Sequence, residues 1–163
     1  MAQYETQKFT KISDFFGVEL RYYPPTMKIQ SPNDFRSLFG FISGKNSQNL
    51  SIKMTTPVYM GDSEGNPVME FVLPRTFDPE NTPKSNSDYV RVFQSKPGYF
   101  LATTFDGFGT ETRRKKFSDK LIREAKNQKL EILGKPIFLA YNSPYKLIGR
   151  KNEMLLEVAY NMN

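Results

Sequence analysis

The segment SPNDFRSLFGFISGKNSQNLSIKMTTPV, residues 31–58, decides how the rest of the chain is interpreted. Its apolar side chains recur at the i, i+3, i+4, i+7 spacing of one helical face. These side chains are Phe35, Leu38, Phe39 and Ile42. A helix this aromatic must cover a large apolar surface, which is either a sheet or a ligand. We therefore predict an amphipathic helix over residues 32–43.

Both ends of this helix carry boundary signals. Ser31 stands where an N-cap belongs, and Pro32 stands at the first helical position. Gly44 is placed to end the helix in the left-handed region. A strand is predicted to follow over residues 52–60, and Pro57 limits its pairing.

Composition excludes several kinds of site. The chain has 163 residues, a net charge of +6, 14 phenylalanines, and neither histidine nor cysteine. Disulfides, thiolate metal sites and imidazole ligands or bases are therefore unavailable from this chain. No stretch approaches the ~20 apolar residues of a membrane helix. The first residues are too polar for a signal peptide, so a cytoplasmic location is expected.

The two halves of the chain repeat one pattern of extended segment, helix, strand and strand. The predicted elements span 18–30, 32–43, 52–60 and 68–73, and then 90–105, 111–128, 136–141 and 153–160. We predict an α+β fold in which duplicated β-α-β-β units form a distorted antiparallel β-barrel or sheet with two flanking helices. Residues 1–11 are interpreted as a polar lead-in to a single domain over residues 12–163.

Six short motifs, in order and spacing, resemble the SOUL / haem-binding protein family. They are VELRYYPP (18–25), FISGKN (41–46), MTTPV (54–58), EFVLP (70–74), TFDGFG (104–109) and AYNSPYKLIGRKNEMLLEV (140–158). The resemblance covers roughly residues 12–160. It implies the duplicated fold, which is shared with bacterial effector-binding domains, and binding of haem or another tetrapyrrole without covalent attachment.

The resemblance also implies where the ligand binds, namely on the first helix and the loop before the last strand. Phe35 and Phe39 correspond to helix positions that are methionine in the vertebrate haem-binding member, and Lys146 corresponds to a lysine in the late loop. Pro32 and Gly40 stand where that member has basic residues.

We predict a tetrapyrrole site from an apolar platform and nearby cations that pair with propionates. The candidate residues are Phe35, Leu38, Phe39, Ile42, Met54, Lys146 and Arg150. The alternative for the helix is that its apolar face packs on the sheet, and the alternative for the late loop is a solvated basic turn. Phe41 lies on the flank of the face, where it could meet ligand or solvent, and Lys45 is a further cation near the helix exit.

Other functions stay open at this stage. The platform could take another bulky amphipathic ligand, such as a linear bilin, a chlorophyll derivative or a hydrophobic cation, and the last would select for an inward-facing Glu70 or Glu153. A buried glutamate with a raised pKa would instead mark a small-molecule hydrolase. Catalytic motifs and metal-ligand clusters are not found, so we expect a binding protein rather than an enzyme. The basic run at residues 113–116 slightly favours an anionic partner, though not nucleic acid.

Overall fold

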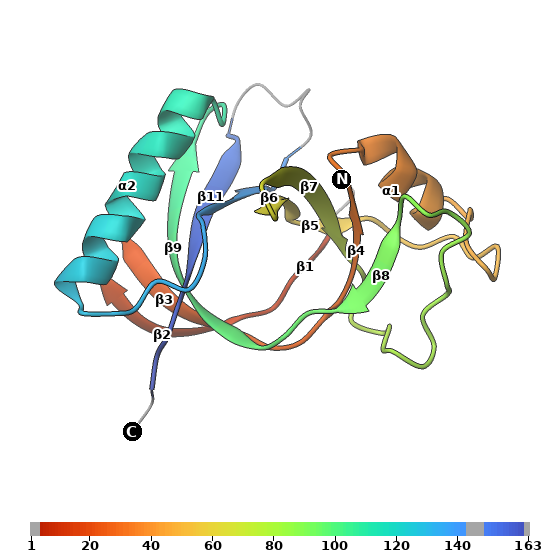
Figure 1. The fold of residues 1–163 in the computed structure, drawn as a ribbon, viewed down its shortest axis with the longest axis horizontal. Helices are drawn as coiled ribbons and strands as arrows, with labels where there is room; N and C mark the ends of the chain where they lie inside the picture. The colour runs from red at the N-terminus through yellow and green to blue at the C-terminus, as the bar shows by residue number, and fades with distance from the viewer. Residues whose placement is uncertain (1–3, 143–148, 162–163) are drawn as a thin grey trace. The chain divides into compact units, whose positions relative to one another are not determined.

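The computed structural model describes residues 4–142 and 149–161. The chain divides into two compact units, and each unit is built from two separate segments. Unit 1 comprises residues 1–7 and 25–96, and unit 2 comprises residues 8–24 and 97–163. Of the helices in the described residues, α1 (Phe35–Ile42) belongs to unit 1 and α2 (Glu111–Asn127) belongs to unit 2, and Figure 1 labels both. None of the described helices is long and apolar enough to cross a membrane.

In the part of unit 1 that the structure describes, four antiparallel strands follow the order β6-β7-β4-β8. A short parallel pair, β1 with β5, lies outside that order. The elements of unit 1 are β1 (Glu5–Thr6), β4 (Met27–Ser31), α1 (Phe35–Ile42), β5 (Thr55–Thr56), β6 (Val58–Ser63), β7 (Asn66–Val72) and β8 (Arg91–Gln94).

The described residues of unit 2 form five antiparallel strands in the order β2-β3-β9-β11-β10. Its elements are β2 (Thr10–Phe15), β3 (Val18–Tyr23), β9 (Gly98–Asp106), α2 (Glu111–Asn127), β10 (Ile137–Ala140) and β11 (Lys151–Val158). The strand order within each unit does not return to its first strand, so neither unit closes on itself as a barrel. The predicted α+β class, with antiparallel strands and two helices, is confirmed.

The predicted order of elements is right, but the division into a first and a second half is not. The extended segment predicted over 18–30 is two strands, β3 in unit 2 and β4 in unit 1, separated at Pro24 and Pro25. The segment predicted over 90–105 likewise separates at Pro97 into β8 and β9. Proline removes a ladder donor and fixes φ, so it breaks a strand without changing its apolar pattern.

The polar lead-in over residues 1–11 contains more structure than its composition suggests. Residues 5–6 form β1, and β2 begins at Thr10. Gln7 is buried, and its side-chain oxygen accepts a hydrogen bond from the Tyr59 hydroxyl at 2.5 Å. The single-domain organisation stays a prediction.

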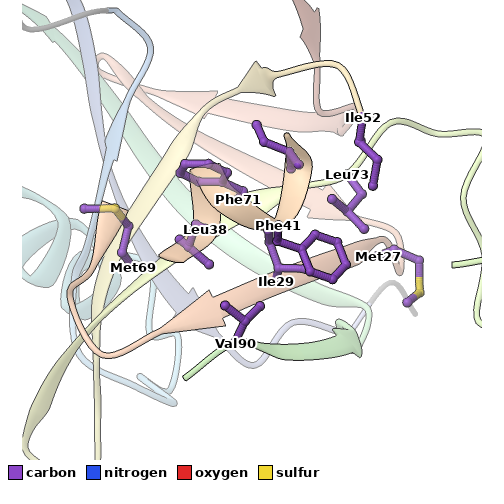
Figure 2. Close-up of a cluster of buried hydrophobic side chains, with 10 residues drawn as sticks. Met27, Ile29, Leu38, Phe41, Ile52, Met69, Phe71, Leu73 and Val90 are labelled. Carbon is purple, nitrogen blue, oxygen red and sulfur yellow. The ribbon is translucent and has the colours of Figure 1, made fainter. Parts of the chain in front are cut away.

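The core of unit 1 lies between α1 and the strands β4 and β7 (Figure 2). Helix α1 contributes its buried side chains Leu38, Phe41 and Ile42. They meet a cluster of buried residues from the strands and loops, namely Met27, Ile29, Ile52, Met69, Phe71, Leu73 and Val90. This packing holds α1 in place, since a helix of eight residues is marginal in isolation.

Helix α1 begins later than predicted, because its N-cap is Asp34 rather than Ser31. The Asp34 carboxylate accepts hydrogen bonds from the backbone N–H groups of Arg36 and Ser37. The Ser31 hydroxyl instead accepts from the Asp34 N–H and donates to the Asp34 carbonyl, which fixes the entry into the helix. Gly44 follows the end of the helix with a φ of 117°, as predicted.

Replacing Asp34 with alanine is expected to lower the urea concentration at the midpoint of unfolding, because the first turn of α1 loses its capping acceptor. The Ser37 hydroxyl and two backbone N–H groups lower the pKa of Asp34 below its ordinary value. The stabilisation is therefore present above the ordinary carboxyl pKa and is lost as the pH falls through the lowered value. Urea unfolding of both proteins at neutral and acidic pH measures this, and an equal difference at both pH values would contradict it.

Helix α2 explains much of the basic run at residues 113–116. The Arg114 Nε donates to the Gly109 carbonyl at 2.7 Å, and its guanidinium lies 3.9 Å from the centre of the Phe138 ring. Arg113 donates to the Asp106 carbonyl at 2.9 Å. Both arginines therefore hold the loop before α2, which is a structural role that the run did not indicate.

Candidate functional site

The exposed side of α1 carries two phenylalanines that face solvent. Phe35 is 48% exposed and Phe39 is 51% exposed, although both belong to a helix packed on the core. Their rings stack, with centres 5.9 Å apart and planes 15° apart. The edge of this pair is anchored, because Phe35 meets the buried Phe71 ring in a T-shaped contact at 5.3 Å. The result is an exposed aromatic pair on a short helix, with the Phe35 ring held against the core.

Two cations lie beside this aromatic pair, Arg36 on the neighbouring flank of α1 and Lys45 just after the helix. Arg36 is exposed and lies one turn before Gly40, which has no side chain. The Lys45 side chain lies against Gly40, because a Cβ added there would sit 3.4 Å from the Lys45 Cδ. Lys45 is itself exposed. We call the surface formed by Phe35, Arg36, Phe39, Gly40 and Lys45 the α1 platform.

Three of the predicted site residues instead serve the core. Leu38 is fully buried and Ile42 is 4% exposed, and both pack against the strands of unit 1. Met54 is half-buried against the same cluster. Phe41, which was expected on the flank of the face, is 1% exposed. Of the four helix residues predicted to contact the ligand, only Phe35 and Phe39 are exposed enough to reach one.

The late loop is described only in part. Lys146 lies outside the described residues. The Arg150 guanidinium, in unit 2, lies 4.7 Å from the centre of the half-exposed Phe108 ring. Its role as a propionate partner stays a prediction.

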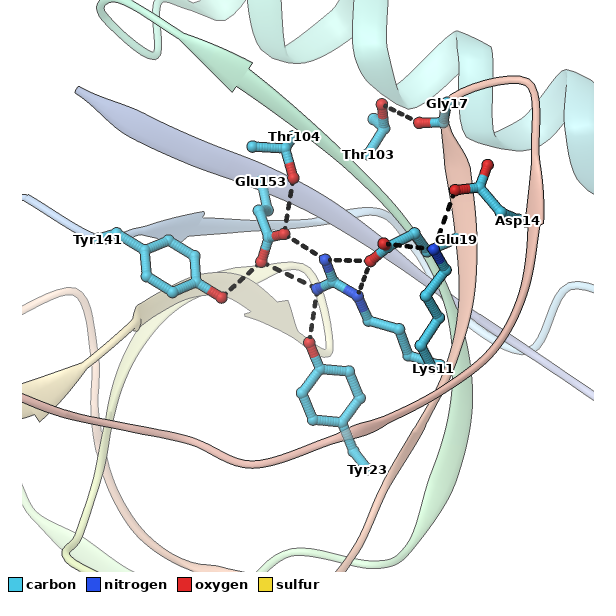
Figure 3. A network of polar contacts seen from close by, with 10 residues as sticks. Lys11, Asp14, Gly17, Glu19, Tyr23, Thr103, Thr104, Tyr141 and Glu153 are labelled. Carbon is cyan, nitrogen blue, oxygen red and sulfur yellow. Dashed lines mark hydrogen bonds and ion pairs between the residues drawn. The ribbon is translucent and has the colours of Figure 1, made fainter. Parts of the chain in front are cut away.

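A buried charged network, which the motifs did not predict, crosses the strands of unit 2 (Figure 3). The Arg21 guanidinium on β3 binds both carboxylate oxygens of Glu153 on β11, with Nη1–Oε1 at 3.0 Å and Nη2–Oε2 at 2.5 Å. Glu153 is completely buried and Arg21 is 4% exposed. The carboxylate also accepts hydrogen bonds from the Thr104 hydroxyl at 2.8 Å and the Tyr141 hydroxyl at 2.5 Å.

Arg21 has further partners that complete the network. Its Nε donates to Glu19 at 2.8 Å, and its Nη1 donates to the Tyr23 hydroxyl at 2.9 Å. The guanidinium also lies 4.0 Å from the centre of the Phe9 ring. All of these residues belong to unit 2.

The network keeps Glu153 ionised. Burial alone would raise the pKa of Glu153, but hydrogen bonds and charge from Arg21, with donors from Tyr141 and Thr104, lower it below the ordinary value. Burial raises the pKa of Tyr23 to about 12 and also raises the pKa of Tyr141, so both phenols stay protonated. A general base needs a pKa near the working pH, and Glu153 does not have one. The raised-pKa glutamate that would mark a hydrolase is therefore not found at Glu153.

Unit 1 contains a second, smaller and partly buried ion pair. The Lys28 ammonium donates to Glu70 at 3.1 Å and lies 3.4 Å from the centre of the Tyr59 ring. Gln30 donates to the other carboxylate oxygen at 2.7 Å. Burial lowers the pKa of Lys28, against the opposing charge of Glu70. The two glutamates that the sequence offered as inward-facing candidates, Glu70 and Glu153, are thus each matched with a cation.

One signal in the sequence could have located Arg21. In VELRYY, the positions Val18 and Leu20 alternate with Glu19 and Arg21, which predicts one polar face for β3. The structure buries Arg21 and Tyr23 on that second face as well. An arginine and a tyrosine two apart on a strand covered on both sides indicate an internal partner, but the pattern cannot identify Glu153, which is 132 residues away. Among the described residues, no group of three acidic side chains is close enough to hold a metal ion.

The fold recurs in solved structures of low sequence identity. A hydrolase from Listeria innocua aligns with a TM-score of 0.61 at 11% identity over 87% of this chain and 91% of that chain. The C-terminal domain of EcmrR aligns with a TM-score of 0.60 at 11% identity over 88% of this chain and 98% of that chain. These likenesses define the class of fold alone.

Sequence comparison gives the family. The model of the SOUL heme-binding protein family matches residues 4–157, so the chain belongs to this family. The chain is also similar to heme-binding protein 2 of Mus musculus, with 26% identity over 160 residues that cover 85% of this chain and 76% of the mouse protein. The predicted resemblance is therefore confirmed.

Proposed function

We propose that this protein binds haem or another tetrapyrrole non-covalently, with the α1 platform as the apolar contact surface. The observation that supports this most directly is the exposure of the stacked Phe35 and Phe39 rings on a helix whose remaining apolar residues are buried. Family membership supports the ligand class, since both the family and the mouse relative are named for haem binding.

The platform suits a flat macrocycle with acidic edges. Aromatic rings gain from offset stacking on a π-system and from removal of apolar surface from water. Arg36 and Lys45 lie beside the aromatic pair and would pair with propionates, which are carboxylates that hydrogen-bond to guanidinium and ammonium groups. The chain thus supplies the apolar contact and the anion partners from one short segment, residues 35–45.

Binding through the macrocycle does not depend on iron. The chain contains no histidine, so an axial ligand would have to be methionine, tyrosine or lysine. If stacking and charge pairing provide the affinity, iron-free protoporphyrin IX should bind nearly as well as hemin. Linear bilins lack the rigid plane and should bind more weakly.

A hydrophobic cation is a less favoured ligand. Such a ligand needs an unpaired buried carboxylate, yet Glu153 is bound by Arg21 and Glu70 is bound by Lys28. Displacing either internal cation would leave it buried without a partner, which costs several kcal/mol.

Titration of the purified protein with hemin, protoporphyrin IX and biliverdin tests the proposal. Absorbance and fluorescence should show saturable one-to-one binding of both porphyrins. Binding of hemin alone would indicate an iron ligand and would contradict the platform. Failure of all three ligands to saturate the protein would contradict tetrapyrrole binding itself.

The Phe39→Ala variant should bind protoporphyrin IX about three- to tenfold more weakly, because half of the stacked pair is lost. Phe39 is half exposed, so the fold should persist. The matched control is Phe16→Ala, which removes a phenylalanine that is 91% exposed in unit 2. Equal affinity of Phe39→Ala and the unmodified protein would contradict the platform, whereas an equal loss in the control would indicate nonspecific adsorption.

A further inference from the structure

The hairpin between β2 and β3 in unit 2 carries an unusual residue at its tip. Phe15 pairs with Val18, so Phe16 and Gly17 form a two-residue turn. Their φ values are 55° and 82°, which is the left-handed pair of a type I′ turn. The first position of this turn favours Asn, Asp or Gly, because bulky residues are strained there. Phe16 therefore occupies a position that local stability does not explain.

The solvent exposure of Phe16 also needs an explanation. Phe16 is 91% exposed, the highest value among the exposed large apolar side chains of the described chain. It gains no burial within unit 2 that would offset the strained backbone. An apolar side chain projecting from a turn in this way can instead enter an apolar phase outside the protein.

The turn lies beside a flank of α2 that is positively charged. A Cβ added at Gly17 would sit 3.2 Å from the Lys120 Nζ, so this ammonium lies directly against the tip. At about 100° per residue, Lys116 and Arg123 lie within about 60° of Lys120 around the helix. Lys116 and Arg123 are both exposed. We call Phe16, Lys116, Lys120 and Arg123 the hairpin-tip surface.

The three cations of this surface are not neutralised within the described chain. None of Lys116, Lys120 and Arg123 forms an ion pair with a described residue. Other cations nearby are paired, such as Lys115 with Asp119 at 3.0 Å. The acidic side chains beside the turn are also compensated, since Lys11 lies 3.2 Å from Asp14.

We propose that the hairpin-tip surface binds an anionic lipid membrane, with Phe16 inserted among the acyl chains and the three cations on the headgroups. Exposed cations gain favourable energy near an anionic bilayer, and a single aromatic side chain suits the boundary between headgroups and acyl chains. A single-stranded nucleic acid would need successive aromatic rings along a basic groove. The aromatic residue of α2, Phe117, is instead stacked on Phe105 at 4.4 Å.

Vesicle sedimentation tests the contribution of the three cations to membrane binding. The protein should bind vesicles of equal parts phosphatidylserine and phosphatidylcholine, should not bind phosphatidylcholine alone, and should be released by high salt. Lys116→Glu and Arg123→Glu should each lower the partition coefficient at least about fivefold. The matched control is Lys115→Glu, which makes the same change of net charge on another flank of α2 and should have a smaller effect. Equal losses in all three variants would overturn the site.

The chain contains no tryptophan, so a single introduced indole reports insertion. The emission of Phe16→Trp should shift to the blue on binding the mixed vesicles, and that of Phe108→Trp should not. Phe16→Ala should lower the partition coefficient about tenfold while leaving protoporphyrin IX affinity unchanged. Absence of the shift, absence of binding to the mixed vesicles, or preferential binding of single-stranded oligonucleotides by the unmodified protein would each overturn the proposal.

Discussion

Replacing Arg21 with methionine is expected to destabilise the protein by about 3–5 kcal/mol, because it leaves the Glu153 carboxylate completely buried without its cation. The bidentate contact, the Tyr23 hydrogen bond and the cation–π contact with Phe9 are lost together. Urea unfolding at neutral pH measures the change. A loss below about 1 kcal/mol would show that the ion pair contributes little beyond its desolvation cost.

The pH dependence of this variant separates a charge effect from a packing effect. In the unmodified protein the lowered pKa of Glu153 gives stability that is present above about pH 4.5 and lost as the pH falls through the lowered value. Without Arg21, burial should raise the pKa of Glu153 above its ordinary value. The stability lost by Arg21→Met should then shrink as the pH falls, since the buried carboxyl becomes protonated.

A double variant provides the control. Arg21→Met combined with Glu153→Leu removes both charges and should recover most of the stability lost in the single variant. If the double variant is no more stable than Arg21→Met, the loss comes from packing and not from an unpaired charge.

Replacing Phe41 with alanine is expected to have the second large effect, a decrease of about 3–5 kcal/mol in the free energy of unfolding. Phe41 is 1% exposed and lies at the centre of the unit 1 core (Figure 2), so its removal leaves a cavity between α1 and the strands. Thermal or urea unfolding measures this loss. A loss below about 1 kcal/mol would contradict the core position of Phe41.

Comparison with Phe39→Ala distinguishes the two faces of α1. Phe39 lies two residues earlier but is 51% exposed, so its replacement should change stability by no more than about 0.5 kcal/mol. Phe41→Ala should thus act mainly on unfolding, and Phe39→Ala mainly on ligand affinity. Equal effects of both variants on stability would contradict the division of the helix into a core face and a platform.

The sequence allowed much of the fold to be predicted because helix α1 and the strands show strong periodic patterns. The spacing of the apolar residues predicted the helix and the six motifs identified the family, but Leu38 and Ile42 were predicted as ligand contacts and lie in the core. The division between platform and core was not predictable, because Phe35 and Phe39 share the same helical spacing as Leu38 and Ile42. Which apolar residues stay exposed depends on how much of the helix the strands cover, and that is a property of the tertiary structure.

The ion pairs could not be predicted for a different reason. Glu153 and Glu70 were recognised as inward-facing candidates, but their cationic partners lie on other strands at 132 and 42 residues' separation. Strand alternation gives the face on which a side chain lies and carries no information about the strand that pairs beside it. Strand alternation suggested a reactive carboxylate at these glutamates but could not show that a cation neutralises each of them.

The assembly of each unit from two separate segments has a consequence for synthesis on the ribosome. All of unit 1 lies within residues 1–96, so it can fold while the rest of the chain is still being made. The β2–β3 hairpin is translated early, but β3 pairs with β9, which is translated later. Glu153, the ion-pair partner of Arg21, is translated 132 residues after Arg21. At a translation rate of about 5–20 residues per second, the Arg21 guanidinium stays exposed to solvent for on the order of ten seconds before its partner is made. Unit 2 can therefore be completed only after β11 has been translated.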